Sequence, residues 1–191
     1  VFTAGDATIA YLKKHHSGSK VFLLGTPSLA ESFRGSGIAI SESDPDLVVI
    51  GYDTTLTYAR LSAFCYFVRK GLPYIATHPD VNCPSPEGPV PDIGAMMSLV
   101  EASTGRKADV VIGKPNPGIV IALAEEWGLE PKEMVMVGDR LYTDIALGKT
   151  AGIRTVLVLS GETKLEDLAS TIYQPDLVCN NLAELASYLI T

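Results

Sequence analysis

Two aspartates in one short stretch, Asp139 and Asp144, are the side chains whose spacing first suggests chemistry. The apolar run Met134–Val137 stops at Gly138, so Asp139 comes where a buried parallel strand would meet its loop, the edge at which open α/β sheets place ligands. Asp144 falls in the first turn of an expected helix, which lets both carboxylates face one small cleft. Two acids held close repel each other, and a cation such as Mg²⁺ relieves that repulsion. An acid that only stabilises a helix N-terminus explains the pattern equally well.

A lysine has a similar placement earlier in the chain. Lys114 follows the expected strand Val110–Ile112, and Asn116 and Pro117 are the expected cap and first residue of the next helix. An anion near Lys114 would meet the ammonium group and the backbone N–H groups of that helix together. A plain solvated lysine is the alternative.

A third candidate site opens a long irregular stretch that runs from His78 to Pro91. The part from Cys83 onward contains four prolines. Loops of this length are uncommon in compact domains unless they have a function. His78 and Asp80 come directly after an expected strand, so their positions would be well defined. A turn-forming role for these two residues is an equally good interpretation.

The elements that must position these side chains alternate between strand and helix along the whole chain, which predicts parallel sheets covered by helices. Thr3 with Asp6 is typical of a capping box, and Thr26 followed by Pro27 is a strong helix start. The expected strands are Val21–Leu24, Leu47–Ile50, Tyr74–Thr77, Val110–Ile112, Met134–Val137, Thr155–Leu159 and Leu177–Val178. The expected helices follow the caps Thr3, Thr26, Thr57, Asp92 and Asn116, with two more around 165–168 and 182–189.

Composition limits the classes of function. The 191 residues carry a net charge of -7, which argues against a nucleic-acid-binding surface because phosphate backbones require clustered lysine and arginine. No apolar run approaches the roughly 20 residues that span a bilayer, so no membrane partner is expected. The three cysteines are far apart and form no C-x-x-C pair, which indicates free thiols of a reducing compartment and hence a cytoplasmic protein. His15 and His16 lack a further ligand at metal spacing and are expected to be surface residues.

Two motifs together resemble a known family. Gly-Lys-Pro-Asn-Pro at 113–117 and Gly-Asp-Arg-Leu-Tyr-Thr-Asp at 138–144 resemble the third and fourth motifs of the haloacid dehalogenase (HAD) superfamily. Leu-Leu-Gly-Thr-Pro at 23–27, Ala-Thr-His-Pro-Asp at 76–80 and Glu-Ala-Ser-Thr-Gly-Arg-Lys at 101–107 are similar to its NagD-type, or 4-nitrophenylphosphatase-type, branch. The resemblance implies an α/β fold in which residues 1–107 form an α/β cap domain with its entering helix. Residues 108–191 would be the C-terminal part of a Rossmann-like HAD core into which the cap is inserted.

The resemblance also implies a role for each candidate. Lys114 would neutralise charge on a phosphoryl group, and Asp139 would be a direct Mg²⁺ ligand. Asp144 would hydrogen-bond Lys114 or a metal-bound water, which also places it at the metal. His78 and Asp80, in the cap, would read the rest of the substrate.

The first two motifs of the family do not occur in these residues. In the family, an aspartate of an Asp-x-Asp-Gly-Thr strand attacks phosphorus to form an aspartyl-phosphate, and a Ser/Thr-Asn-Asn motif binds the phosphoryl oxygens. The only Asp-x-Asp here, Asp44 to Asp46, precedes a cap strand and is expected to form a turn. We therefore expect a piece of a longer protein, inactive alone, in which the strand before Asp139 becomes a sheet edge.

The sequence thus predicts part of a Mg²⁺-dependent phosphatase that hydrolyses a small phosphomonoester of the sugar phosphate, phosphoglycolate or 4-nitrophenyl phosphate class. Its partner would be a small phosphorylated metabolite, and a homo-oligomer formed through the cap is left open. Two alternatives remain. One is a non-catalytic HAD-like domain that binds phosphorylated metabolites, and the other is a receiver-like phosphoacceptor, which the cap and the order of lysine and aspartates disfavour.

Overall fold

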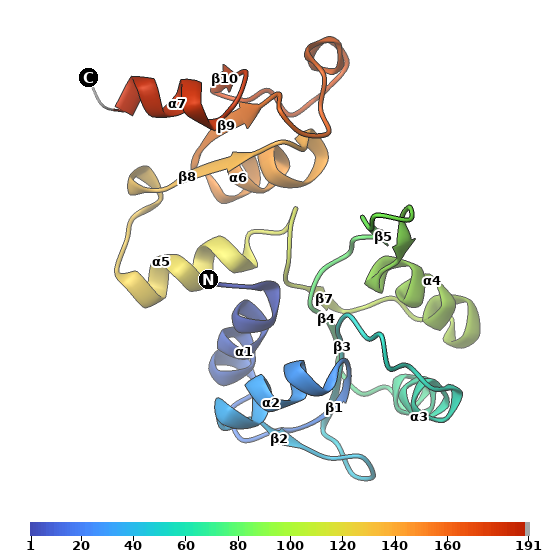
Figure 1. Cartoon of the computed structure of the whole chain (residues 1–191). Coiled ribbons are helices and arrows are strands. Elements are labelled where there is room, and N and C mark those ends of the chain that lie inside the picture. Colours follow the sequence, from blue (N-terminus) through green and yellow to red (C-terminus); the bar gives the residue numbers. More distant parts are fainter. Residues whose placement is uncertain (190–191) are drawn as a thin grey trace. The chain divides into compact units, whose positions relative to one another are not determined.

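The computed structural model describes residues 1–189 and divides into two compact units, the first running from Val1 to Gly113 and the second beginning at Lys114 (Figure 1). The expected boundary between cap and core lay six residues earlier, after Lys107. The intervening residues include β7 (Val110–Val111), which pairs with β4 in the sheet of the first unit. The assignment of the two units as cap and core stays a prediction.

A five-stranded parallel sheet forms the centre of the first unit, with the strand order β2-β1-β3-β4-β7. The strands besides β7 are β1 (Lys20–Leu24), β2 (Ala39–Ile40), β3 (Leu47–Ile50) and β4 (Tyr74–Ala76). The helices are α1 (Ala4–His15), α2 (Pro27–Gly35), α3 (Tyr58–Arg69) and α4 (Ile93–Thr104). The order reverses between β1 and β3, and doubly wound sheets bind ligands beyond the carboxyl ends of the strands at such a reversal.

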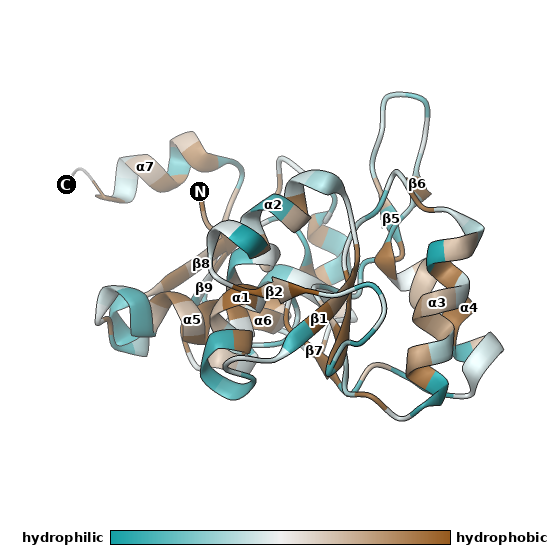
Figure 2. Cartoon of the chain, turned by 90° about the horizontal axis from the view of Figure 1, so that it is seen from below, coloured by the Kyte–Doolittle hydropathy of each residue, from teal (hydrophilic) through white to brown (hydrophobic). Residues whose placement is uncertain are grey.

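Both faces of this sheet are covered. Helices α1 and α2 lie on one face and α3 and α4 on the other (Figure 1). Alternate strand residues point to opposite faces, and Phe22, Val48 and Tyr74 pack with Phe64 of α3 and Ile93 of α4 in one cluster of buried side chains. Figure 2 shows the strands largely in the brown of hydrophobic residues. This double burial explains why the strands are continuous apolar runs.

Local signals set most helix starts. Thr3 and Asp6 form the expected capping box of α1, because Thr3 Oγ1 accepts from the Asp6 N–H while the Asp6 carboxylate accepts from the Thr3 N–H. The Thr26 side chain caps α2, with Pro27 at its first position, and Thr57 caps α3. These three starts confirm the sequence-based expectation.

The stretch after β4 is more ordered than expected. Strands β5 (Asn82–Cys83) and β6 (Val90–Pro91) pair antiparallel within it, so only part of the stretch from His78 to Pro91 is irregular. The prolines allow this pairing because the ladder is short and sits apart from the main sheet, where a missing N–H donor is tolerated.

A three-stranded parallel sheet forms the centre of the second unit, in the order β10-β9-β8. Its strands are β8 (Val135–Gly138), β9 (Arg154–Val158) and β10 (Leu177–Cys179). Its helices are α5 (Gly118–Trp127), a π-helix (Leu141–Ile145), α6 (Ala146–Ala151) and α7 (Leu182–Leu189), with short 3₁₀ turns at Pro131–Glu133 and Leu165–Ala169.

Two expectations for the second unit were wrong. Pro117, not Asn116, occupies the position before α5, and it has no side-chain group that could cap the helix. The run around β8 is also less buried than predicted, since Val135 is 53% exposed. This exposure agrees with the expected sheet edge, because β8 is the last strand of this sheet and, among the described residues, pairs only with β9.

Two further features bear on the class of protein. Cys65, Cys83 and Cys179 are all free thiols. Within residues 1–189, every helix is too short or too polar to cross a bilayer.

Candidate active site

The ammonium group of Lys114 lies 2.6 Å from Oδ1 of Asp144. The two residues are 30 positions apart in the sequence, and no local pattern dictates their contact. The Asp144 side chain is 5% exposed whereas that of Lys114 is 40% exposed, so the lysine reaches a buried carboxylate from the solvent side. Oδ2 of Asp144 accepts a hydrogen bond from the backbone N–H of Arg140 at 3.2 Å. Both carboxylate oxygens therefore have partners.

Asp139 follows β8 directly and has a different environment. Its Oδ2 accepts a hydrogen bond from the Glu162 N–H at 2.8 Å, and its carbonyl oxygen accepts from the Thr163 N–H. Its Oδ1 accepts no hydrogen bond from the described residues. Asp139 is partly exposed, so one hard anionic oxygen is left to bind a cation, which is the donor type that Mg²⁺ prefers.

Two glycines make room for these acids. A Cβ atom on Gly138 would overlap Cβ, Cγ and Oδ2 of Asp144, and a Cβ atom on Gly161 would overlap the carboxylate of Asp139. Gly138 ends β8, and Gly161 comes just after the neighbouring strand β9. The carboxyl ends of these parallel strands share one edge of the sheet. Any other residue type at either glycine would displace a carboxylate.

The loop after β9 is also tied to the loop after β8 by Glu162, which sequence reasoning missed. Its Oε2 lies 2.7 Å from Nε of Arg140, and its Oε1 accepts a hydrogen bond from the Tyr142 hydroxyl at 2.6 Å. Glu162 lies about 20 residues from both partners in sequence, so only the register of β8 against β9 could have revealed the contact.

In the first unit, the structure brings His78 and Asp80 together with a third residue, Asp92. Nε2 of His78 lies 3.2 Å from both Oδ1 and Oδ2 of Asp92. A ligand atom from each of the three residues lies within 4.8 Å of the other two. The sequence indicated Asp92 only as the cap of α4, a role that it does fill by accepting from the Ile93 N–H.

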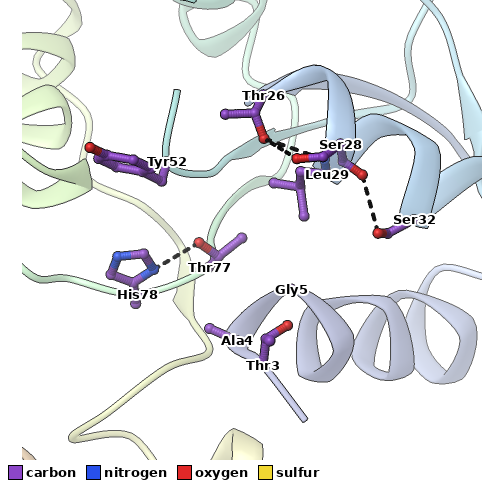
Figure 3. A pocket seen from close by; sticks show the side chains of 10 residues that line it. All are labelled: Thr3, Ala4, Gly5, Thr26, Ser28, Leu29, Ser32, Tyr52, Thr77 and His78. Atoms are coloured by element: carbon purple, nitrogen blue, oxygen red, sulfur yellow. Dashed lines mark hydrogen bonds between the residues drawn. The ribbon is translucent and has the colours of Figure 1, made fainter. Parts of the chain in front are cut away.

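His78 also borders a pocket of about 370 Å³ at the carboxyl ends of β1, β3 and β4. Figure 3 shows the lining side chains arriving from four segments around the hollow. They are Thr3, Ala4 and Gly5 at the start of α1, Thr26 with Ser28, Leu29 and Ser32 in the cap and body of α2, Tyr52 after β3, and Thr77 and His78 after β4. Hydroxyls and an imidazole dominate the polar atoms of this pocket, and it lies at the strand-order reversal described above. A polyol or sugar is the class of ligand that such groups can hydrogen-bond.

Comparisons with known proteins identify the family. A family model described as HAD-hydrolase-like matches residues 111–185. An acid sugar phosphatase of Staphylococcus epidermidis is 38% identical over 176 residues, which cover 92% of this chain and 68% of that protein. The chain belongs to the HAD-like hydrolases.

Solved structures of HAD-like hydrolases agree with this assignment. A 4-nitrophenylphosphatase from Thermotoga maritima is 53% identical with a TM-score of 0.93, over 98% of this chain and 72% of that chain. A p-nitrophenyl phosphatase from Archaeoglobus fulgidus is 33% identical with a TM-score of 0.90, over 97% of this chain and 73% of that chain. The family resemblance and the α/β fold class expected from the sequence are thereby confirmed.

Proposed function

We propose that this HAD-like chain acts as part of a phosphatase that hydrolyses small phosphomonoesters. The similar proteins named as acid sugar phosphatase and 4-nitrophenylphosphatase support this function. The observation that carries it is the contact of Lys114 with the buried Asp144, beside an Asp139 that keeps one carboxylate oxygen for a cation. None of these findings favours a non-catalytic binding domain.

Each residue has a chemical role in this proposal. Lys114 neutralises negative charge on the phosphoryl oxygens, an effect that grows as the transition state forms. Asp139 would hold Mg²⁺, and Asp144 orients the Lys114 ammonium. When bound, Mg²⁺ supplies a positive charge that offsets the phosphate charge. One or two carboxylates are the usual protein contribution to such a site.

The attacking aspartate is not supplied by these residues, because the sequence contains no Asp-x-Asp-Gly-Thr motif. The half of the site that this chain carries can bind and neutralise a phosphoryl group, and it lacks the group that attacks phosphorus. A test of function therefore needs the chain joined to an N-terminal segment that carries the first two motifs, taken from a related 4-nitrophenylphosphatase. We call this protein the joined chain.

The joined chain should hydrolyse 4-nitrophenyl phosphate with Mg²⁺, whereas residues 1–191 alone should not. In the joined chain, Asp139→Asn should lower Mg²⁺ affinity and turnover together, since it removes an anionic ligand. Asp144→Asn should lower turnover by less, about 10- to 100-fold, because Asp144 acts on the reaction by positioning Lys114. Initial rates across a Mg²⁺ titration measure both effects. An unchanged Mg²⁺ dependence in Asp139→Asn would show that the ligand is assigned wrongly.

We also propose that residues 1–107 are the cap and that His78, which lines the pocket, and Asp80, which lies near His78 outside it, read the organic part of the substrate. The core has few site residues, and these are needed to bind the phosphoryl group. Few core side chains therefore remain to contact the organic part of the substrate. The pocket beside His78 has a mostly apolar surface, and its hydroxyl groups can hydrogen-bond the hydroxyls of a phosphorylated sugar.

The free thiols support a reducing, cytoplasmic location. A homo-oligomer formed through the cap stays a prediction, which sedimentation of the chain at several concentrations would test.

A further inference from the structure

The cluster of His78, Asp80 and Asp92 has the composition of a metal site, one imidazole nitrogen and two carboxylates. We propose that these three residues bind a divalent first-row transition metal, for which Zn²⁺ is the probe. The proposal goes beyond the phosphatase function, because the cluster lies in the first unit whereas Asp139 and Asp144 lie in the second.

The spacing of His78 and Asp92 is compatible with metal ligation. Metal–ligand bonds of about 2.1 Å at tetrahedral or octahedral angles hold neighbouring ligand atoms about 3.0–3.4 Å apart. His78 Nε2 lies 3.2 Å from each Asp92 oxygen, at the long end of the range for an N–H···O hydrogen bond and within the range for two ligand atoms on one metal. The ligand atom of Asp80 lies within 4.8 Å of those of His78 and Asp92, so a rotation of its side chain would bring it to the same ion.

The second nitrogen of the His78 ring has the partner that a metal-binding histidine needs. Nδ1 lies 3.1 Å from Oγ1 of Thr77, a residue that is only 3% exposed. When Nδ1–H donates to that hydroxyl, Nε2 carries the lone pair and points at the carboxylates. Metal-bound imidazoles typically donate their other N–H in this way, which fixes the ring orientation.

The backbone holds the two acids side by side. The carbonyl of Asp80 accepts from the Gly94 N–H at 2.8 Å, and the Asp92 N–H donates to the carbonyl of Val81 at 2.9 Å. Gly94 is required at this approach, since a Cβ atom there would lie 2.9 Å from the Asp80 carbonyl oxygen and would also overlap that of Pro79. The site is thus built by close packing of α4 against the segment after β4.

A bound cation would also neutralise the negative charges of the two carboxylates in the cluster. Asp92 is 6% exposed, and no lysine or arginine pairs with Asp80 or Asp92 among the described residues. The Asp80 carboxylate has no hydrogen bond within that part of the chain, so it is free to rotate onto a metal. An imidazole ligand selects Zn²⁺ and similar ions over Mg²⁺, which prefers oxygen alone.

The test is calorimetric titration of the 191-residue chain with Zn²⁺, carried out in the Asp139→Asn background so that the second unit contributes no direct ligand. We expect one bound Zn²⁺ per chain, unaffected by millimolar Mg²⁺. Asp80→Asn and His78→Asn should each weaken binding by about tenfold or more, since even groups that act only on a ligand change affinity by that factor. The matched control is His15→Asn with His16→Asn, which removes the other two histidines and should leave binding unchanged.

A second measurement separates ligation from folding. At one fixed Zn²⁺ concentration, the melting temperature should rise less for Asp80→Asn than for the parent and the histidine control. The metal-free melting temperature of Asp80→Asn should match the parent, because its side chain has no partner to lose. Co²⁺ bound in place of Zn²⁺ should give visible absorption that His78→Asn alters. Absence of saturable Zn²⁺ binding, or equal affinity in Asp80→Asn, would show that Asp92 is only a helix cap with a histidine neighbour.

Discussion

Lys114 Nζ lies 2.6 Å from Oδ1 of Asp144, and this contact joins the segment before α5 to the π-helix after β8. The carboxylate is buried and the ammonium is partly exposed. Removing the lysine therefore leaves a buried negative charge without its cation, which is costlier than losing a surface ion pair.

Lys114→Met should destabilise the chain by about 1–3 kcal/mol, the cost of leaving a buried charged group unpaired, reduced here by the partial exposure of the pair. The double variant with Asp144→Asn should lose less than the sum of the single variants, because they share one interaction. Urea unfolding of the four proteins measures the coupling. Lys132→Met is the matched control, since its 2.7 Å pair with Glu130 is exposed on both sides and should contribute less than about 1 kcal/mol. Additive losses would mean that the contact does not stabilise the fold.

Gly138→Ala should destabilise the second unit by about 1–3 kcal/mol and lower turnover in the joined chain, because the added methyl group overlaps the Asp144 carboxylate. Gly35→Ala is the control, because a Cβ atom there meets nothing within 4 Å and the residue ends α2. That change should be neutral or slightly stabilising. Equal effects of the two substitutions would contradict the close approach of Gly138 to Asp144.

Sequence reasoning succeeded where the deciding interactions are local. The capping box of Thr3 and Asp6 spans three residues, and both hydrogen bonds form as expected. The apolar runs of β1, β3 and β4 likewise predicted buried parallel strands, since both faces of the sheet are covered.

It failed where the deciding contact is distant. Asp92 lies 14 residues from His78, and the β5–β6 hairpin separates them. No sequence periodicity predicts that a helix-capping residue contacts a histidine on the other side of a hairpin. Glu162 meets Asp139 and Arg140 only because β8 and β9 pair in a particular register. The apolar run that ends at Val137 led to an overestimate of the burial of Val135, although the edge position of β8 was expected from the missing motifs.

In the joined chain, His78→Ala and Asp80→Ala should change the ratio of kcat/KM between phosphorylated sugars and glycolate-like acids by about tenfold, as expected when polar groups that contact a substrate are lost. Turnover of 4-nitrophenyl phosphate should stay within about threefold, because that substrate offers few groups for the pocket to bind. A panel of phosphomonoesters measures both, with the exposed Asp44→Ala as control. Uniform loss on every substrate would mean that His78 and Asp80 only hold the fold of the first unit.

The last prediction concerns acid stability in the second unit. Hydrogen bonds from Lys149 and Thr155 lower the pKa of Asp176 to about 2 from its ordinary 3.8. Because the folded-state pKa lies below the unfolded one, this carboxylate stabilises the fold fully above about pH 4, and the contribution is lost as the pH falls toward about 2.

Asp176→Asn should therefore lower the melting temperature at about pH 6, and its difference from the parent should shrink between about pH 4 and pH 3. Added salt at about 0.5 M should reduce the difference at the higher pH, because the Lys149 pair is accessible to ions. If the melting-temperature difference stayed constant down to about pH 3, Asp176 would stabilise the fold as a hydrogen-bond acceptor and not through its negative charge.

The pocket of the first unit is lined by residues at the start of α1 and by residues that follow β1, β3 and β4, and by none within these strands. The residues that a ligand in this pocket would contact are thereby separate from the residues that hold the sheet together. Recognition can evolve by substitutions at Thr26, Tyr52 and Thr77–His78 while the apolar strands stay unchanged. A combinatorial library confined to those positions should yield many folded variants with altered ligand preference, whereas an equally large library within the strands should yield few folded proteins.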